Sequence, residues 1–324
     1  MIRKEDIQKF TQLFSCDRIM ILMHCRPDGD TLGTGFALKR LLELNGKRVT
    51  AVCNDEVPKK LDFFTEGKKN LDPDFEPETI VTVDTATPEL LGKKYEAYAN
   101  RVWLAVDHHA TNSLYAENTI LYPDKSSAGE LLSDLIYESG ITYDSVVASC
   151  LYGAISFDTG CFRFSNVKPE THLAAARLLS FDFDAAEMNR RMFDLAPLGQ
   201  LKVENELLQN AELFCGGKAV IVTLTLDMVE QSGAAESDFE GLAAIARRIE
   251  GTYVSATLRE NSDNSVRVSL RSECNIDVSV IASEFGGGGH VRASGCTINK
   301  PVDEVKELIM NSVERAFEKS EYQL

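Results

Sequence analysis

The 324-residue sequence lacks several features that would define its class at once. It has no run of about 18 apolar residues, which a membrane-spanning helix needs, so we expect no membrane partner. Its first residues, MIRKEDIQKF, lack the apolar core and cleavage site of a signal peptide, and the expected location is therefore the cytoplasm. Its eight cysteines include no Cys-x-x-Cys pair, which favours reduced thiols over disulfides or a zinc finger.

Positive charge is also scarce. The chain has 34 Lys and Arg against 50 Asp and Glu, a formal net charge of −16. Proteins that hold long nucleic-acid duplexes neutralise the phosphates with basic residues, so a long duplex is excluded as a partner. A polyanionic substrate must therefore be short, or be held by local positive charge such as bound metal ions. The sequence leaves open whether the chain forms a homodimer.

The first half of the chain alternates strands with helices. Apolar runs over 17–24, 47–53, 79–84 and 101–107 predict buried strands, and helical spacing predicts helices over 31–46, 127–140 and 143–158. Such alternation is typical of an α/β fold, in which a parallel sheet carries helices on both faces. We expect this domain to span 1–190.

The pattern changes beyond this point. A long polar helical stretch over 185–213 is interrupted at Pro197 and Gly199, and we interpret 191–214 as a connector helix region. Strands are predicted over 218–225, 252–260 and 265–272. A short helix then leads into a glycine-rich loop, and an amphipathic helix over 301–320 closes the chain. The sequence thus predicts a second, smaller α/β domain over 215–324.

Acidic and histidine side chains gather where predicted strands and helices end. They are His24, Asp28, Asp30, Asp84, Asp107, His108, His109 and Asp158. Ligands of open α/β sheets bind at the carboxyl ends of strands, and converging carboxylates repel one another unless cations hold them. Taken singly, Asp84 and Asp158 are better interpreted as helix caps or turn formers. Together, Asp and His groups without thiolates favour Mn²⁺ or Mg²⁺ over structural zinc.

A second candidate region is the run Gly286–Gly289 followed by His290. Glycines let a backbone approach an anion closely, although a flexible linker is the simpler interpretation. The spacing fits neither a Rossmann fingerprint nor a P-loop. Arg271, on a nearby strand, is suited to bind a phosphate with two parallel hydrogen bonds, and Arg292 and Arg259 are weaker candidates. Rings that follow Asp158 either stack on a base or pack in the core.

These motifs together resemble the DHH phosphoesterases. His-x-Arg-Pro-Asp-Gly-Asp (24–30), Val-Asp (83–84), Asp-His-His (107–109) and Phe-Asp-Thr-Gly (157–160) follow the four motifs of that family. The late Gly-Gly-Gly-Gly-His (286–290) with Ala-Ser-Gly (293–295) resembles the DHHA1 domain that often follows. A stand-alone chain of this length resembles the NrnA-type oligoribonucleases, or nanoRNases, which also dephosphorylate adenosine 3′,5′-bisphosphate (pAp).

The resemblance implies a role for each of these residues. His24 and Asp28 would hold one metal ion, Asp30, His108 and Asp158 a second, and Asp84 would bridge the two. Asp107 would orient a ligand histidine, and His109 would face the scissile phosphate. The resemblance places the active site in the cleft between the domains. The nucleotide would be held there, opposite the metals, by a set of residues in the second domain: Arg271, Gly287, Gly288, Gly289 and His290.

The implied activity is a phosphodiesterase and phosphatase that uses two divalent ions, with Mn²⁺ preferred and Mg²⁺ as the alternative. It would hydrolyse short single-stranded RNA to mononucleotides and remove the 3′-phosphate of pAp. Hydrolysis of linear or cyclic dinucleotides such as pApA or cyclic di-AMP is the alternative. An inorganic pyrophosphatase shares only the first-domain motifs. A non-catalytic nucleic-acid-binding module conflicts with the net charge.

Overall fold

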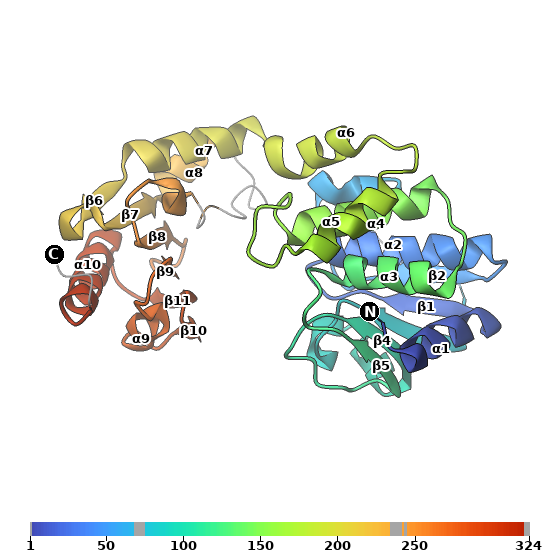
Figure 1. Cartoon of the computed structure of the whole chain (residues 1–324). Coiled ribbons are helices and arrows are strands. Elements are labelled where there is room, and N and C mark those ends of the chain that lie inside the picture. Colours follow the sequence, from blue (N-terminus) through green and yellow to red (C-terminus); the bar gives the residue numbers. More distant parts are fainter. Residues whose placement is uncertain (1, 68–74, 234–241, 243–244, 321–324) are drawn as a thin grey trace. The chain divides into compact units, whose positions relative to one another are not determined.

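The computed structural model describes residues 2–67, 75–233, 242 and 245–320. The chain divides into two compact units, Met1–Leu195 and Ala196–Leu324 (Figure 1). The segment that the sequence predicts as a connector is divided between them. Within the described residues, none of the helices combines the length and the apolar character needed to cross a membrane. All eight cysteines are free thiols, as expected.

A five-stranded parallel sheet forms the centre of the first unit, in the order β2-β1-β3-β4-β5. Its strands are β1 (Ile19–Leu22), β2 (Val49–Val52), β3 (Thr79–Val83), β4 (Val102–Asp107) and β5 (Asn118–Leu121). Their apolar runs are almost wholly buried, as strands covered on both faces require. The sequence predicted four of these strands, and β5 was missed because Asn118–Leu121 is short and half polar.

Helices pack around this sheet, and Figure 1 shows α2, α3 and α4 stacked along one side of it. The α-helices of the unit are α1 (Lys4–Gln12), α2 (Gly29–Leu44), α3 (Ala128–Ser139), α4 (Ser145–Asp158), α5 (Pro169–Leu178) and α6 (Ala185–Asn189). Short 3-10 helices are η1 (Leu13–Ser15), η2 (Lys59–Thr65), η3 (Pro88–Leu91) and η4 (Glu96–Arg101). A π-helical turn, η5 (Arg190–Asp194), follows α6.

Three helices meet at one small side chain. A Cβ atom built on Gly129 of α3 would lie 2.5 Å from Cβ of Ala154 in α4. A Cβ built on Gly33 of α2 would lie 2.9 Å from the same atom and 2.5 Å from the carbonyl oxygen of Cys150. Real Cβ atoms do not approach this closely, so only glycine allows α2, α3 and α4 to pack at this distance.

The second unit is built on a six-stranded mixed sheet in the order β10-β11-β9-β8-β7-β6. Its strands are β6 (Glu212–Phe214), β7 (Ala219–Leu224), β8 (Val254–Glu260), β9 (Val266–Ser272), β10 (Gly288–His290) and β11 (Ala293–Ile298). Only the β7–β8 pair is parallel. The predicted glycine loop is therefore partly a strand, because Gly288–His290 pairs with β11.

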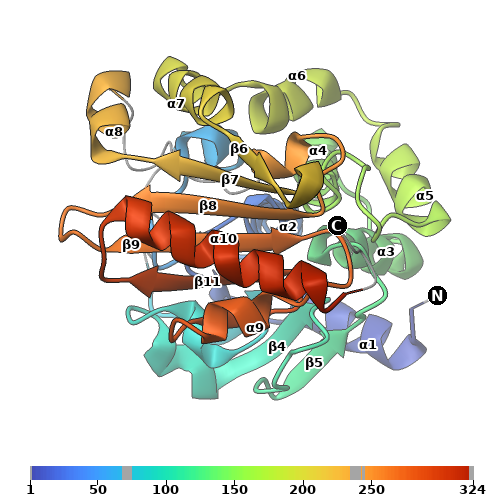
Figure 2. The same ribbon diagram turned by 90° about the vertical axis from the view of Figure 1, so that its left-hand side faces the viewer.

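The two faces of this sheet differ. Helices α9 (Val278–Ser283) and α10 (Val302–Glu318) cover one face, and Figure 2 shows α10 lying across the strands. On the other face, α7 (Leu198–Gln209) buries Val203 and Leu207 against β7, with α8 (Leu226–Ser232) and η9 (Ala246–Arg248) as shorter elements. The turn η6 (Cys215–Gly217) joins β6 to β7, and its Cys215 packs with the core on the α10 side. Alternation along β9 turns Val266, Val268 and Leu270 inward and the intervening polar residues outward.

Candidate metal centre

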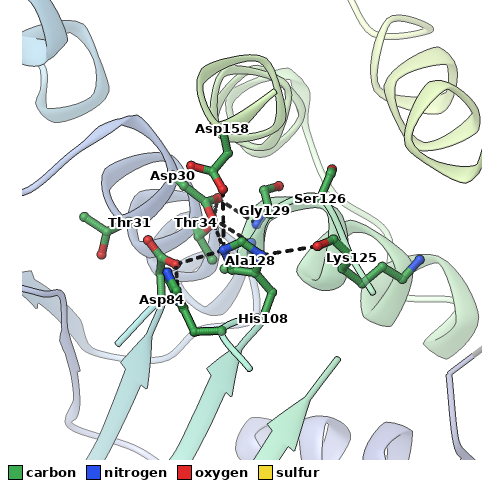
Figure 3. A network of polar contacts seen from close by, with 12 residues as sticks. Asp30, Thr31, Thr34, Asp84, His108, Lys125, Ser126, Ala128, Gly129 and Asp158 are labelled. Carbon is green, nitrogen blue, oxygen red and sulfur yellow. Dashed lines mark hydrogen bonds and ion pairs between the residues drawn. The ribbon is translucent and has the colours of Figure 1, made fainter. Parts of the chain in front are cut away.

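The first unit brings an acid–histidine cluster together at the carboxyl ends of β1, β3 and β4. Its members are His24, Asp28, Asp30, Asp84, His108 and Asp158, each of which the sequence predicted as a metal ligand. Asp84 follows β3, His108 follows β4, and Asp158 is the last residue of α4. Figure 3 shows Asp30, Asp84, His108 and Asp158 pointing toward one another.

Asp84 lies at the centre of the cluster and is only 2% exposed. Its Oδ2 atom is 3.4 Å from Nε2 of His24, and its Oδ1 atom is 3.5 Å from Nε2 of His108. Its φ of +51° is left-handed, and its backbone N–H donates to the carbonyl of Val106 at 3.0 Å. An aspartate held in this costly conformation indicates a functional constraint on the turn after β3.

The two histidines of the cluster present the same nitrogen to it. Nδ1 of His24 lies 2.8 Å from the carbonyl of Cys25, and Nδ1 of His108 lies 3.2 Å from the carbonyl of Lys125. Since a carbonyl only accepts, both Nδ1 atoms carry the proton. Each Nε2 therefore faces the carboxylates and offers a lone pair once it loses its proton, which is how metal-ligating histidines are held in proteins.

Asp28 and Asp30 both lie at the N-terminus of α2. Asp28 is the N-cap, and its Oδ1 accepts from the N–H groups of Asp30 at 3.0 Å and Thr31 at 3.1 Å. Asp30 is fully buried and accepts from the N–H groups of Ala128 at 2.7 Å and Gly129 at 2.9 Å. Its Oδ2 is 3.6 Å from Nε2 of His108. Capping and ligation are therefore compatible roles for these aspartates.

Asp107 and His109 form a pair beside the cluster. Oδ1 of Asp107 accepts from Nδ1 of His109 at 2.8 Å and from the backbone N–H of His108 at 2.8 Å. Its Oδ2 accepts from the side chain of Asn112 at 2.6 Å. Asp107 therefore orients the ring of His109, whereas the carbonyl of Lys125 orients that of His108. The proton on Nδ1 of His109 leaves its Nε2 as the free nitrogen.

Burial and charge shift the pKa values in the cluster strongly. Burial opposes the charged form of His24, but its contacts with Asp28 and Asp84 raise its pKa to about 11. Burial likewise opposes the charged form of His108, but Asp84 and Asp30 raise its pKa to about 10. Burial and the charge of Asp84 raise the pKa of Asp158 to about 7 and that of Asp30 well above its usual value. These groups therefore hold protons where a cation would otherwise balance the charge.

The donor set fits a divalent cation. Within the described residues, Oδ1 of Asp84 is buried and has no hydrogen-bond partner, which is costly for a charged oxygen unless a cation lies beside it. Among the described residues, three groups of ligand atoms lie close enough to share an ion: His24, Asp28 and Asp84; Asp30, His108 and Asp158; and Asp84, His108 and His109. In the third group, Nδ1 of His109 is already bonded to Asp107. Carboxylate and imidazole ligands without thiolates suit Mn²⁺ or Mg²⁺.

Several supporting residues were missed from the sequence. Asn112 bonds Asp107, the Lys125 carbonyl bonds His108, and Glu130 bonds Ser126 at 2.5 Å. Ser127 caps α3, whereas the backbone N–H of Ser126 donates to Glu130. The motif Ser-Ser-x-x-Glu is a capping-box signature. A glutamate in such a motif is expected to cap the helix, so its contacts with Ser126 could not be predicted from the sequence.

The second unit places Arg271 and Gly288 around a polar cavity of about 610 Å³, together with Arg267 and Ser269. Arg271 is half-buried, and burial and the nearby Arg247 lower its pKa. Gly287, Gly289 and His290 do not line this cavity. His290 is exposed, and Cβ atoms on Gly287 and Gly289 would lie 2.2 and 2.6 Å from backbone oxygens of β11. Those two glycines therefore allow β10 to approach β11.

Comparisons with known proteins agree with this geometry. Residues 18–155 match the DHH family, N-terminal domain, and residues 216–319 match the DHHA1 domain. The chain is 30% identical over 309 residues to the bifunctional oligoribonuclease and PAP phosphatase NrnA of Thermus thermophilus, across 94% of this chain and 91% of that protein. The Bacillus subtilis protein of the same name is 27% identical over 288 residues, across 87% and 90% of the two chains.

The chain is therefore a hydrolase of the DHH phosphoesterase family. Within that family it belongs with the NrnA proteins, as the motifs predicted. A crystal structure of an exopolyphosphatase-related protein from Bacteroides fragilis is similar over 97% of both chains, with a TM-score of 0.87 and 25% identity. RecJ from Thermus thermophilus, in complex with Mn²⁺, shares the fold at a TM-score of 0.50 and 16% identity, across 96% of this chain and 54% of RecJ.

Proposed function

We propose that this protein hydrolyses short RNA oligonucleotides to mononucleotides and removes the 3′-phosphate of pAp, with two divalent cations in the acid–histidine cluster and Mn²⁺ as the preferred metal. The observation that carries the proposal is the position of Asp84. Each of its two oxygens faces a different histidine, His24 or His108. Such a carboxylate is suited to bridge two ions, and relatives with both named activities align over most of the chain.

Charge supports two ions better than one. Asp28, Asp30, Asp84 and Asp158 carry four negative charges when ionised, and the two histidines are neutral as ligands. Two divalent cations balance four negative charges, whereas one leaves an excess in a buried site. When bound, such a pair supplies positive charge for phosphoryl oxygens and lowers the pKa of a coordinated water.

The chain's own residues organise the reaction. Asp107 holds His109 and raises its pKa, which favours the protonated ring whose Nε2–H can donate to a phosphate oxygen, and Asn112 fixes the other oxygen of Asp107. The N–H groups of Ala128 and Gly129 keep Asp30 turned toward His108. Because these partners are placed before substrate arrives, little reorganisation is needed during the reaction.

The second unit would recognise the nucleotide. Arg271 and Gly288 line a polar cavity in which an arginine and a close backbone can hold a phosphate, and His290 lies on the same short strand as Gly288. A cavity of about 610 Å³ suits one or two nucleotides rather than a long strand. A chain with net charge −16 also repels long polyanions.

The alternative substrate is a linear or cyclic dinucleotide. The cyclic-di-AMP phosphodiesterase GdpP of Geobacillus thermodenitrificans is 23% identical over 323 residues, but the alignment covers only 48% of that protein. The greater similarity to NrnA relatives favours RNA fragments and pAp.

One comparison of substrates tests the proposal. Purified protein with Mn²⁺ is given a dinucleotide, a 5-mer, a single-stranded and a duplex 24-mer, pAp, linear pApA and cyclic di-AMP, and kcat/KM is measured for each. We expect the highest values for the RNA dinucleotide, the 5-mer and pAp, and none after chelation. A higher kcat/KM for cyclic di-AMP or for either 24-mer would overturn the assignment.

A further inference from the structure

The segment Lys125–Gly129 contacts two metal-ligand side chains at once. The carbonyl of Lys125 accepts from Nδ1 of His108 at 3.2 Å, and the N–H groups of Ala128 and Gly129 donate to Asp30 at 2.7 and 2.9 Å. Figure 3 shows this segment beside the cluster, with the ammonium group of Lys125 pointing away from it. The position of this segment therefore sets the orientation of both ligands.

Glu130 holds the segment from the buried side. Its Oε2 atom accepts from the backbone N–H of Ser126 at 3.1 Å, from its hydroxyl at 2.5 Å and from the hydroxyl of Thr171 at 2.9 Å. Its Oε1 atom accepts from Nζ of Lys125 at 3.0 Å. Glu130 is 2% exposed, so its carboxylate is committed to these four donors.

A buried ion pair is weak evidence for stability, because two apolar residues of similar size often stabilise a fold as well. The pair of Glu130 and Lys125 contributes here by fixing the position of the segment that contacts His108 and Asp30. Groups that hold the ligands of a metal from behind set its affinity, and their loss typically costs 10- to 100-fold. Burial opposes the ionised form of Glu130, but bonds from Ser126 and Lys125 outweigh it and lower its pKa.

We propose that Glu130 is a positioning residue of the metal centre, which acts through Lys125 and Ser126 on His108 and Asp30. The inference rests on the cation site of the proposed function but not on its substrate.

Asp134 offers a matched control. It also contacts Nζ of Lys125, at 2.5 Å, and it pairs with Arg177, but it has no bond to Ser126. Glu130→Gln and Asp134→Asn each remove one carboxylate charge from the same lysine. We expect Glu130→Gln to weaken Mn²⁺ binding about 10- to 100-fold in calorimetric titration. Asp134→Asn is expected to stay within about twofold of wild type, although its unfolding temperature falls.

Ser126→Ala covers the case in which Glu130→Gln fails to fold, since it deletes only one hydroxyl. It is expected to weaken Mn²⁺ binding severalfold with an unchanged circular dichroism spectrum. Wild-type affinity in Glu130→Gln, or in Ser126→Ala where the former is unfolded, would overturn the proposal, as would equal losses in Asp134→Asn. A chain that binds Mn²⁺ but hydrolyses no nucleotide would overturn the proposed substrate alone.

A separate observation concerns Arg26. A cavity of about 350 Å³ adjoins the cluster, and among the described residues that line it Arg26 is the one lysine or arginine. Its side chain is exposed, its φ is +53°, and its backbone N–H donates to Oδ2 of Asp55 at 2.8 Å. A non-glycine residue held in the left-handed region points to a function that requires this placement.

Three carboxylates in the remaining lining of this cavity repel a phosphate. Asp28, Asp84 and Asp158 all line it, so an anionic ester needs positive charge on the chain as well as on the cations. Given the proposed function, we infer that Arg26 binds a phosphate oxygen of the substrate. Its fork of N–H donors matches two such oxygens, which a lysine cannot do.

Inhibition by inorganic phosphate and turnover of pAp test this role. Arg26→Ala should raise the KM for pAp and the phosphate inhibition constant about 10- to 150-fold, the worth of a charged hydrogen bond. Arg26→Lys should restore only part of the affinity for pAp and phosphate. The Mn²⁺ affinity should be unchanged in both variants. Arg101→Ala, an exposed arginine paired with Glu76, is the control. Unchanged phosphate inhibition in Arg26→Ala would refute the role, whereas a wild-type chain inactive on pAp but inhibited on a synthetic ester would refute only the proposed substrate.

Discussion

The two units hold their candidate functional residues in opposite ways. In the first, Asp30, Asp84 and Asp107 are buried, and most of their oxygens already have protein partners. In the second, the hydrogen bond of the Arg271 side chain within the described residues goes to the carbonyl of its own neighbour, Leu270, and His290 is exposed. The first arrangement is fixed before any ligand arrives, whereas the second must lose side-chain freedom when a ligand binds.

This difference suggests a division of work. A rigid, charged centre is suited to stabilise a transition state, and a polar surface that carries arginines is suited to select a nucleotide. Changes in the first unit should therefore lower kcat for every phosphate ester. Changes in the second should depend on the substrate. The predictions below test that contrast.

The largest effect is expected for Asp84→Ala. It removes the central carboxylate, so kcat should fall about 100- to 1000-fold for pAp, for a dinucleotide and for bis-p-nitrophenyl phosphate alike. Since Asp84 lies after a strand end, the circular dichroism spectrum should not change. Exposed Asp124 is the control, as Asp124→Ala. More than about a tenth of wild-type activity on each ester would exclude a central role for Asp84.

The two adjacent histidines should separate metal binding from substrate contact. His109→Ala should lower activity on pAp about 100-fold, because its free Nε2 is lost, while the chain still binds two Mn²⁺. His108→Ala should lose Mn²⁺ as well, because its Nε2 faces three carboxylates. Calorimetric stoichiometry checks both variants. Equal loss of metal in the two would contradict the assignment.

Arg271→Ala should act on natural substrates alone. Loss of a charged hydrogen bond should lower kcat/KM for a dinucleotide and pAp about 10- to 150-fold. The activated ester bis-p-nitrophenyl phosphate needs only the metal centre, and its hydrolysis should hardly change. Parallel kinetics on the two substrate types provide the measurement. A similar loss on both would mean that Arg271 supports the fold, and the contrast between the units would fail.

The last prediction concerns pH and tests the first unit alone. In the metal-free chain the pKa values of His24 and His108 are about 11 and 10, so both carry protons at pH 7 that a metal must displace. Mn²⁺ affinity should therefore rise with pH, by about tenfold per pH unit for each proton released. Calorimetry in two buffers of different ionisation enthalpy counts those protons. An affinity that is constant between pH 6 and 8 would contradict this linkage.

Much of the first unit was predictable, because short stretches of its sequence are enough to indicate its strands and their ends. Apolar runs that end in Asp84 and Asp107 indicate parallel strands, and the edge where such strands end is where ligands bind. The membership of the acid–histidine cluster therefore followed from position and residue type, whereas the role of each member as a metal ligand is what the family resemblance implies. Glu130 did not, because nothing in Ser-Ser-x-x-Glu distinguishes a cap from a group that holds Lys125 and Ser126.

The second unit was less predictable. The strand β10 consists of Gly288, Gly289 and His290, which have low strand propensity, and it forms only because β11 pairs with it. Close approach at Gly287 and Gly289 depends on long-range packing that no local pattern reports. The sequence therefore indicated that glycines mattered there without separating those that serve packing from Gly288, which lines the cavity.

The contact of Gly33 and Gly129 with Ala154 has a consequence for variation in the family. The methyl group of Ala154 lies between three helices. Of these, α2 carries Asp30, α3 carries the amides that hold Asp30, and α4 carries Asp158. A larger residue at position 154 would force these helices apart together and would alter the spacing of ligands that it does not touch. Substitution at Ala154 is therefore expected to change the spacing of the acid–histidine cluster while each of its aspartates and histidines stays the same.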